Sequence, residues 1–507
     1  MAAHDTVIRE ATVYDGSGAP PVVADVAIDG DRIAAVGTIA GSARATLDGR
    51  GLALSPGFID VHTHDDFAAV LHPDMAFKLC GGVTTCVVGN CGMGAAPYAQ
   101  AAAMAKHFHP HATLPEWEGY TGYLAHLDRA PAAVNIGVLV GHGTARLAAM
   151  GLEARTPSRS EMAAMKAIVA EGLAAGALGL SSGLIYDPGR FAATAELAEL
   201  ALLMRGSGGL YATHMRDEGA GLLDSVGEAI DIGESAGVPV QISHHKASGR
   251  AAWGLVRESL KLIEAAQQRG FNVHADQYPY TAGSTVLSAV FRDGAFGGGI
   301  GPMQPADIVI ASTASHPEWE GKSMVALAEA MGIAPAAAAA RVLKAEPNTT
   351  VVLHVMSEDD VRTVMRHPST MIGSDGIPTL EGKPHPRLYG TFARVLGLYA
   401  RDLGQFSLTE AVYRMTGFPA AKFGLEGRGL VRPGVFADLV LFDPARIIDK
   451  GTFEDPKRHP DGIAAVWVNG ALSVRDGSPL GVRAGRTLRR APPPPGNSSP
   501  LPASPRA

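Results

Sequence analysis

A series of short, almost entirely apolar runs in the middle of the chain constrains its fold more than any other feature. The eight runs end near Val61, Val88, Val140, Leu180, Ala212, Ile242, Val273 and Ile372. Most are separated by segments with helical spacing of apolar residues, such as the one that begins at Ser158, where Glu161 completes a capping-box pattern. Apolar strands alternating with helices predict a parallel sheet covered by helices, and eight of them predict a (β/α)8 barrel. An open doubly wound sheet is the alternative, but no glycine-rich phosphate-binding sequence follows the first strand.

Both ends of the chain carry a different pattern, of short β-strands separated by turns. An Asp-Gly pair near the N-terminus and an Asn-Gly pair near the C-terminus each mark a tight hairpin turn. We therefore expect residues 1–54 and 425–488 to form one small β domain beside a barrel of residues 55–424. Residues 489–507 are rich in proline and serine, and we expect them to be disordered because they have almost nothing to bury.

One interval in the middle is too long for a single strand and helix. Roughly ninety residues separate "HADQYPYTAGST" from "TMIGSDGIP", whereas a βα unit needs about thirty. We expect the excess, about residues 286–349, to be an insertion over the mouth of the barrel that acts as a lid.

The composition argues against several classes of protein. The chain of 507 residues has a formal net charge of −7 and a pI of about 6.2, which does not favour a nucleic-acid surface. It has no run of about 18 apolar residues that would predict a membrane span, and its start lacks a secretory signal pattern. Its three cysteines, Cys80, Cys86 and Cys91, make no extracellular disulfide framework. We therefore expect a soluble, cytoplasmic protein in which a cysteine binds metal or takes part in catalysis.

Polar residues suited to metal binding follow the ends of the predicted strands. They are His62, His64, Cys91, His142, Tyr186, His214, His244, Asp276, Tyr278 and Asp375. In a parallel barrel the carboxyl ends of all strands meet at one rim, where catalytic groups lie. A free cysteine is usually a small buried hydrophobe, as we expect for Cys80 and Cys86. Imidazole, thiolate and carboxylate groups together favour zinc, which accepts nitrogen, sulfur and oxygen ligands.

Several motifs resemble those of one enzyme family. "PGFIDVHTHDD", "GVTTCVVGNCGMGAAP", "GLSSGLIYDPG", "YATHMRDE", "ISHHKASG", "YPYTAGST", "MIGSDGIP" and "HPRLYGTFARVLG" look like the N-acyl-D-amino-acid deacylase (D-aminoacylase) branch of the amidohydrolase superfamily. The resemblance runs from "VYDG" to "VRDG", nearly the whole chain, in the expected order. It implies an α/β fold, a (β/α)8 TIM-like barrel with a β-sandwich built from both termini and a lid insertion.

The resemblance also implies the metal ligands. It assigns one tightly held zinc to three donors, namely Cys91, His214 and His244. It places a second, weaker metal position near three more, His62, His64 and Asp375. Many superfamily relatives bridge two metals with a carboxylated lysine on the fourth strand, but here that strand ends "LGLSSGLIYDPG", without a lysine. Cys91 is therefore expected in the bridging place.

The activity that this resemblance implies is hydrolysis of the amide bond of N-acyl-D-amino acids, which releases a carboxylic acid and a D-amino acid. A zinc-activated water would attack the carbonyl, and Asp375 would pass its proton to the leaving nitrogen. Tyr186 would help to stabilise the oxyanion. The substrate carboxylate would be bound by Lys246, Tyr278 and Arg292. The partner would thus be a small molecule.

Three points stay open at the level of the sequence. A dihydroorotase-like or hydantoinase-like hydrolase of cyclic amides is an alternative, but it would need the bridging lysine. A noncatalytic scaffold on this fold is another, but it should have lost metal ligands. The role of His142 is undecided because its surroundings, "VGHGTAR", depart from the family pattern.

Overall fold

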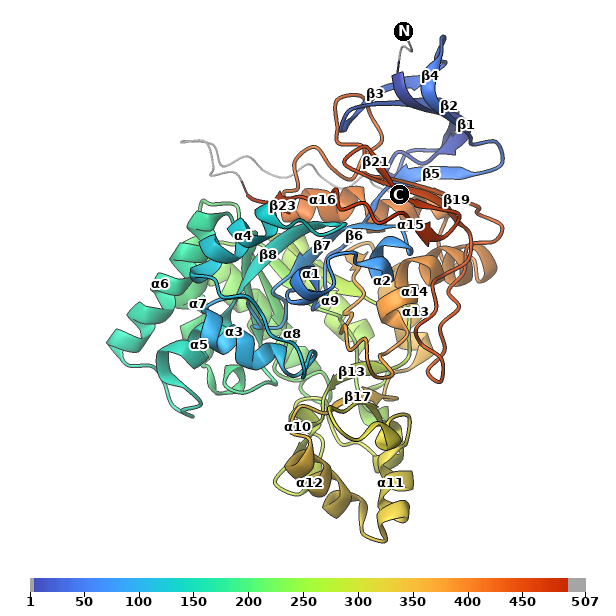
Figure 1. The fold of residues 1–507 in the computed structure, drawn as a ribbon. Coiled ribbons are helices and arrows are strands. Elements are labelled where there is room, and N and C mark those ends of the chain that lie inside the picture. Colours follow the sequence, from blue (N-terminus) through green and yellow to red (C-terminus); the bar gives the residue numbers. More distant parts are fainter. Residues whose placement is uncertain (1–3, 491–507) are drawn as a thin grey trace.

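Eight parallel strands form a barrel at the centre of the computed structural model, which describes residues 4–490 (Figure 1). In sheet order the strands are β18 (Thr370–Ile372), β12 (Val273–Gln277), β11 (Val240–Ile242), β10 (Leu210–His214), β9 (Gly179–Gly183), β8 (Asn135–Gly141), β7 (Val83–Val88) and β6 (Phe58–Asp60). The first and last strands meet through the loops that follow them. The amide of Asp375 donates to the carbonyl of His62 at 2.7 Å, and the amide of His64 donates to that of Gly376 at 3.0 Å. The predicted (β/α)8 barrel is confirmed.

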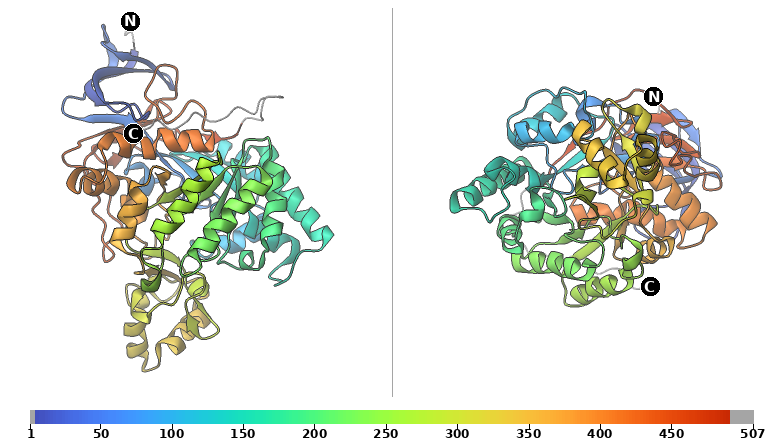
Figure 2. Two further views of the ribbon diagram at one scale, coloured as in Figure 1. Left: turned by 180° about the vertical axis from the view of Figure 1, so that it is seen from behind. Right: turned by 90° about the horizontal axis from the view of Figure 1, so that it is seen from below.

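Helices cover the outside of the barrel, as the views in Figure 2 show. They include α4 (Gly119–Arg129), α5 (His142–Met150), α6 (Arg159–Ala175), α7 (Thr194–Ala201), α8 (Leu222–Ala236), α9 (Val256–Gln268), α13 (Glu358–Arg366), α14 (Arg387–Arg394), α15 (Leu408–Met415) and α16 (Gly417–Phe423). Three further helices follow the first two strands: α1 (Ala68–Leu71), α2 (Ala76–Leu79) and α3 (Tyr98–Ala105). Helix α6 begins at the predicted capping box, in which the Ser158 amide donates to the Glu161 carboxylate at 2.7 Å.

Strand β12 departs from the sequence prediction. Its apolar run was expected to end near Val273, but the strand begins there and continues through polar residues to Gln277. Two of these polar side chains, which point to the same face of the strand, have polar partners. His274 lies 3.1 Å from Nζ of Lys422, and Asp276 accepts a hydrogen bond from Gln241 at 2.8 Å. A strand can therefore carry buried polar groups wherever its neighbours satisfy them.

A second sheet of nine strands joins the two ends of the chain. Its strands are β1 (His4–Val13), β2 (Val22–Asp29), β3 (Arg32–Gly37), β4 (Ala43–Asp48), β5 (Ala53–Pro56), β19 (Leu439–Phe442), β20 (Ile463–Val468), β21 (Ala471–Arg475) and β22 (Ser478–Pro479). The N-terminal and C-terminal halves meet where β5 pairs with β19 in antiparallel fashion. The expected β-sandwich is hydrogen-bonded as one continuous sheet over an apolar core that includes the buried Trp467.

The boundary expected at residue 488 is different in the structure. Strand β23 (Thr487–Leu488) pairs with β8, so it extends the barrel sheet instead of the β domain. The next two residues are also held on the barrel, since Arg489 pairs with Asp128 at 2.5 Å and the Arg490 guanidinium donates to the carbonyl of Ser207 at 3.1 Å. The rest of the predicted disordered tail, residues 491–507, lies outside the described residues.

The segment between β12 and β18 forms a separate small unit on the side of the barrel away from the β domain (Figures 1 and 2). Its three-stranded antiparallel sheet consists of β13 (Gly283–Val286), β16 (Ile308–Ser312) and β17 (Thr350–Leu353). A short hairpin, β14 (Phe291–Arg292) and β15 (Ala295–Phe296), follows α10 (Leu287–Val290). We call residues 286–349 the insertion. It leaves the barrel at the carboxyl end of β12, the end at which a barrel enzyme carries its active site.

The alanine-rich stretch of the insertion forms two helices. Helix α11 (Met324–Met331) ends at Gly332, whose φ of 65° is left-handed, and α12 (Pro335–Ala345) starts with proline. Glycine ends helices in this conformation and proline begins them, so the two signals together break the stretch. No single described helix is long and apolar enough to cross a membrane, while α11 and α12 meet that test only as a pair bent by 89°.

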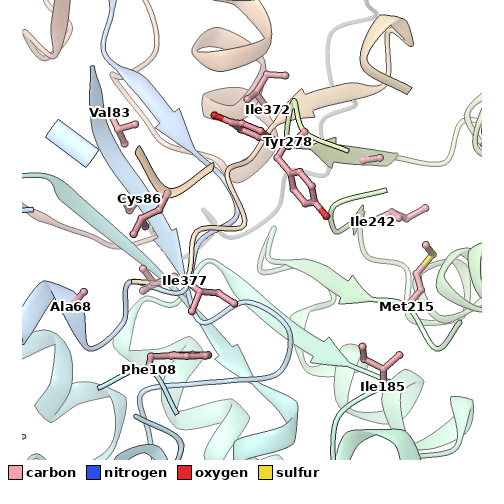
Figure 3. Packing of buried hydrophobic residues seen from close by; sticks show 14 of the residues in the cluster. Ala68, Val83, Cys86, Phe108, Ile185, Met215, Ile242, Tyr278, Ile372 and Ile377 are labelled. Carbon is pink, nitrogen blue, oxygen red and sulfur yellow. The ribbon is translucent and has the colours of Figure 1, made fainter. Parts of the chain in front are cut away.

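Buried apolar side chains of the barrel form two clusters, the larger of which is shown in part in Figure 3. Cys80 and Cys86 lie within the larger cluster, fully shielded from solvent, as predicted. Burial raises the pKa of the Cys80 thiol to about 12 and that of Cys86 well above its ordinary value. Both thiols therefore act as small apolar side chains, unlike the third cysteine.

Candidate functional site

The third cysteine lies at the rim of the barrel among imidazole nitrogens. Sγ of Cys91 is 3.3 Å from Nε2 of His62, 3.9 Å from Nδ1 of His214 and 3.8 Å from Nε2 of His244. Zinc binds sulfur at about 2.3 Å and nitrogen at about 2.0 Å, so two ligands of one tetrahedral ion are about 3.5 Å apart. These four side chains are all buried and have the chemistry of a zinc site, and the donor atoms of three of them, Cys91, His62 and His244, lie within 4.8 Å of one another.

A second group of donors adjoins the first. Oδ1 of Asp375 lies 3.2 Å from Nε2 of His64 and 3.5 Å from Nε2 of His62. His62 therefore belongs to both groups, and Cys91 lies beside it. The donor atoms His62, His64 and Asp375 are close enough to hold a second ion. The structure thus brings together all six residues that the resemblance implies as ligands.

Three of these residues adopt left-handed backbone conformations that side chains other than glycine rarely take. The φ angles are 54° at Cys91, 36° at His244 and 50° at Asp375. Such conformations cost of order 1–3 kcal/mol each and persist only where surrounding contacts hold them. At Cys91 the hydroxyl of Ser181 on β9 supplies such a contact by accepting from the next amide, Gly92 N, at 3.0 Å.

Asp276 on β12 orients two of the candidate ligands. Its Oδ1 lies 3.2 Å from Nδ1 of His62 and accepts from the amide of His244 at 2.8 Å. Its other oxygen accepts from Gln241. A carboxylate that holds one imidazole nitrogen leaves the other free for a metal. The sequence indicated Asp276 only as a polar strand end, because this role depends on residues from three strands.

Opposing effects act on the pKa values of Cys91 and Asp375. Burial alone would raise the pKa of the Cys91 thiol, but His62 and hydrogen bonds from the surrounding imidazoles hold it well below its ordinary value. Burial would likewise raise the pKa of Asp375, whereas Arg387 and the neighbouring histidines hold it well below the ordinary range. Both groups are therefore anionic, as metal ligands or a proton acceptor must be.

Arg387, at the start of α14, is a component of the site that the sequence reasoning missed. Its Nη1 lies 2.9 Å from Oδ2 of Asp375, and its guanidinium stacks over the ring of Tyr278 with a centroid distance of 4.4 Å. The only signal in the sequence was its place in the motif "HPRLYGTF". A fully buried arginine next to a candidate catalytic carboxylate marks this side of the pocket as positive.

The predicted substrate-binding residues Lys246 and Tyr278 lie beside the metal donors. Nζ of Lys246 is 2.7 Å from Oε1 of Glu218 and 5.9 Å from the centre of the Tyr278 ring. The Tyr278 hydroxyl donates to Sδ of Met356 at 3.5 Å. Lys246 is therefore already paired with a buried glutamate, Glu218, which the sequence reasoning did not identify.

Tyr186 and Arg292 have other immediate partners than those expected. The Tyr186 ring packs against His214, with centroids 5.1 Å apart, while its hydroxyl hydrogen-bonds to Thr285 at 3.0 Å. Arg292 donates to the carbonyl of Ile185 at 2.7 Å, and in the described part of the chain it makes no hydrogen bond or ion pair with Lys246 or Tyr278. Tyr186 thus borders the metal donors, whereas Arg292 connects the insertion to the loop after β9.

His142, whose role was left open, is separate from the metal donors. Its Nε2 lies 2.8 Å from Oε1 of Glu196, whose other oxygen is 2.5 Å from Nη1 of Arg146. All three side chains are buried. This cluster pairs each charge with a partner, which is the usual condition for polar groups in a core.

A buried charge network lies beneath the Asp375 loop. Nζ of Lys78 is 2.7 Å from Oδ2 of Asp60 and donates to the hydroxyl of Ser374 at 2.8 Å. The amide of Ser374 donates to Oδ1 of Asp60 at 2.8 Å. Because Ser374 directly precedes Asp375, this network sets the path of the backbone that carries the candidate proton shuttle. Lys78 was not indicated by the sequence.

A cavity of about 210 Å³ lies next to the site, between the loop of residues 107–112 and the insertion. Its lining includes His72, His109 and Leu380. Phe108, also in the lining, packs against the candidate ligand His64 with ring centroids 5.9 Å apart. The cavity therefore adjoins the metal donors through one aromatic side chain.

Comparison with known proteins points to one group of enzymes. The sequence profile of the amidohydrolase family matches residues 45–474. D-aminoacylase of Alcaligenes xylosoxydans xylosoxydans is 43% identical over 495 residues, which cover 96% of this chain and 98% of that protein. N-acyl-D-aspartate deacylase of the same organism is 40% identical over 96% of this chain and 95% of its own length. A crystal structure of N-acyl-D-glutamate deacylase from Bordetella bronchiseptica superposes on this chain with a TM-score of 0.87 at 37% identity, and the match covers 96% of this chain and 99% of that one. That structure contains zinc and a phosphonate inhibitor that mimics the tetrahedral intermediate.

Proposed function

This chain belongs to the amidohydrolase family, in its branch of N-acyl-D-amino-acid deacylases, and we propose that it hydrolyses N-acyl-D-amino acids at a zinc site with Asp375 as proton shuttle. It is a metal-dependent amidohydrolase that acts on linear amides. The finer assignment rests on one observation, the buried cluster in which the thiol of Cys91 faces three imidazole nitrogens from other strands.

The donor set supports one tight zinc, held by Cys91, His214 and His244. His62, His64 and Asp375 would form a second and weaker position, because a neighbouring ion and a shared thiolate reduce its net attraction for another cation. When bound, zinc supplies Lewis-acid chemistry that activates a water molecule and polarises the amide carbonyl. The zinc and phosphonate in the related N-acyl-D-glutamate deacylase support the choice of metal and of reaction.

The chain's own residues would then move the proton. Asp375 accepts the proton of the attacking water and returns it to the leaving nitrogen, so that one carboxylate serves first as base and then as acid. Its Oδ2 is held by Arg387 and its Oδ1 faces His64, which keeps the carboxylate in one orientation. Tyr186, packed against His214, would contribute to the wall around the oxyanion.

The substrate carboxylate would bind on the side of the site that carries positive charge. Lys246 and Arg387 lie over the same aromatic ring, that of Tyr278, and present two cations to one region of the pocket. Arg292, which the resemblance also implies, would reach the substrate only after releasing the carbonyl of Ile185. Selectivity for the D configuration is inferred from the relatives.

The alternative of a cyclic-amide hydrolase has less support. The bridging lysine that it requires would come from the fourth strand, β9, whose last residues are Ser181, Ser182 and Gly183. Both serine hydroxyls are already hydrogen-bonded, Ser182 to Tyr211 at 2.6 Å. A noncatalytic scaffold is disfavoured because every expected donor is present and buried.

A matched panel of N-acetyl-D- and N-acetyl-L-amino acids, assayed on the purified zinc enzyme, tests the function. We expect release of the free amino acid from the D members only. Elemental analysis of Cys91→Ala tests the metal site, and this variant should lose tightly bound zinc and activity together. Full zinc retention would remove Cys91 from the site, and equal turnover of both enantiomers would remove the proposed selectivity.

A further inference from the structure

Glu218 lies behind two of the candidate zinc ligands, on the side away from Cys91. Its Oε1 is 3.0 Å from Nδ1 of His244, and its Oε2 is 3.8 Å from Nε2 of His214. The opposite nitrogens of the same two rings are those that face the thiol. One carboxylate therefore offers one oxygen to each imidazole.

This arrangement bears on which nitrogen of each ring carries a proton. A ring nitrogen that binds zinc must be unprotonated, so the proton must be on the other nitrogen, which then needs an acceptor. In the described structure Nε2 of His214 and Oε2 of Glu218 are both buried without a hydrogen-bond partner, and they lie 3.8 Å apart. Glu218 is thus in place to hold both rings in the metal-binding tautomer.

The position of Lys246 shows why a carboxylate is needed beside His244. Its Nζ is 2.8 Å from Nδ1 of His244 and 2.7 Å from Oε1 of Glu218. An ammonium can only donate, so a bond from Lys246 to Nδ1 would place the ring proton on Nε2, the nitrogen that faces Cys91. Oε1 of Glu218 accepts from Lys246 and lies 3.0 Å from Nδ1 of His244, so it is in place to accept the ring proton at Nδ1, which would leave Nε2 free.

Glu218 itself is rigidly held. Its side chain is completely buried. Its amide donates to the carbonyl of Gly299 in the insertion at 2.7 Å, and its carbonyl accepts from the amide of Ser248 at 2.7 Å. The residue is therefore anchored at both ends, as a group that orients ligands should be.

We propose that Glu218 is a positioning residue that holds His214 and His244 in their metal-binding orientation by facing, on each ring, the nitrogen that lies away from Cys91. The inference rests on the proposed zinc site. Outer groups of this kind typically change metal affinity by about 10–100-fold.

Zinc affinity is the decisive measurement, obtained by competition of the zinc-loaded enzyme with a chromophoric chelator. We expect Glu218→Gln to bind zinc about 10–100-fold more weakly than the wild type. We also expect its cobalt-substituted form to show altered d–d absorption, a readout that needs no turnover. If Glu218→Gln folds poorly because it leaves Lys246 buried without a partner, the double variant Glu218→Gln/Lys246→Met provides the same test without that lysine. We expect its zinc affinity to be as low as that of Glu218→Gln.

Glu196→Gln is the matched control, because Glu196 is also buried and also pairs with a strand-end histidine and a cation. It should bind zinc like the wild type. Wild-type affinity in Glu218→Gln, or its recovery in the double variant, would overturn the proposal, since Glu218 would then be only a counter-ion of Lys246. Cys91→Ala in the same assay separates the proposed zinc site from the proposed role of Glu218. If Cys91→Ala keeps its zinc, the proposed metal site is wrong. If Cys91→Ala loses zinc but Glu218→Gln does not, only the role of Glu218 is wrong.

Discussion

Nη1 of Arg387 lies 2.9 Å from Oδ2 of Asp375, and neither side chain has substantial access to solvent. The ion pair leaves Oδ1 of Asp375 as the oxygen that faces the imidazoles. A buried pair of this kind is worth retaining only if it serves a purpose besides stability, because desolvation offsets much of the attraction. We attribute that purpose to the orientation of a carboxylate that must accept and return a proton.

Replacement of Asp375 by asparagine should abolish turnover and leave the tight zinc in place. The amide keeps the size of the side chain but cannot cycle a proton, and general acid–base groups contribute about 10²–10⁴-fold to the rate. kcat and zinc content of the same preparation are the measurements. Loss of zinc together with activity would make Asp375 chiefly a ligand, and near-normal kcat with zinc bound would disprove the shuttle.

Arg387→Lys should lower kcat/KM by about one to two decades at unchanged zinc content. The lysine keeps the charge but loses the planar guanidinium that pairs with Asp375 and stacks over Tyr278, and polar contacts to a charged group are worth about 1.5–3 kcal/mol. Arg394→Lys is the control, because Arg394 lies on the same helix, stacks over Tyr280 at 4.8 Å and pairs with Asp449 at 3.1 Å. Equal effects of the two changes on kcat/KM would argue against a specific role for Arg387.

Lys78→Met should destabilise the protein strongly. It leaves the carboxylate of Asp60 buried without its cation, and removal of one partner of a buried pair costs about 3–5 kcal/mol. Denaturant titration gives the free energy of unfolding, and Lys78→Met/Asp60→Asn should recover part of the loss. Lys261→Met, which removes an exposed pair with Glu258, should change stability by no more than about 0.5 kcal/mol. A similar small loss in Lys78→Met would show that the buried network is dispensable.

Stability should fall as the pH drops from about 6.5 to about 4, in part because of His109. Burial, together with electrostatic repulsion from the neighbouring His72, lowers the pKa of His109 to about 4. Between pH 4 and the ordinary pKa of 6.5, His109 is protonated in the unfolded chain but not in the folded protein, so lowering the pH favours unfolding. Above pH 6.5 the contribution of His109 to stability is constant. The shift corresponds to roughly 3 kcal/mol at most. His109→Gln should therefore lose less stability than the wild type between pH 7 and pH 5 in denaturant titrations, and parallel losses would contradict this assignment.

The insertion should become more protected when the site is filled. The hydrogen bonds that tie it to the barrel rim include those from the Glu218 amide to Gly299 at 2.7 Å, from His111 to the carbonyl of Ala314 at 3.0 Å and from Arg292 to the carbonyl of Ile185 at 2.7 Å. Lids of this kind close over bound ligands. Hydrogen exchange with and without a phosphonate analogue of the tetrahedral intermediate measures the change over residues 286–349. Equal protection in both states would indicate a static insertion.

Local pattern in the sequence was sufficient to predict the barrel and the residues at its rim. Each candidate metal donor follows an apolar run, and in a parallel barrel every such position is brought to the same rim regardless of the lengths of the connecting helices. Cys91, His214 and Asp375 could therefore be grouped without knowledge of any contact between them. The resemblance to deacylases rested on the same strand-end motifs.

The partners behind that rim were decided by the tertiary structure alone. Arg387 reaches Asp375 from a helix after the last strand, and Lys78 reaches Ser374 across almost 300 residues of chain. The pairing of Glu218 with Lys246 depends on the conformation of two loops, whose sequences show no periodic pattern. A long side chain in an irregular loop can point in many directions, and burial of its charge is acceptable only where the fold supplies an opposite one. The choice between these directions is made by packing, so the sequence could indicate the candidate ligands at the rim but not the residues that hold them.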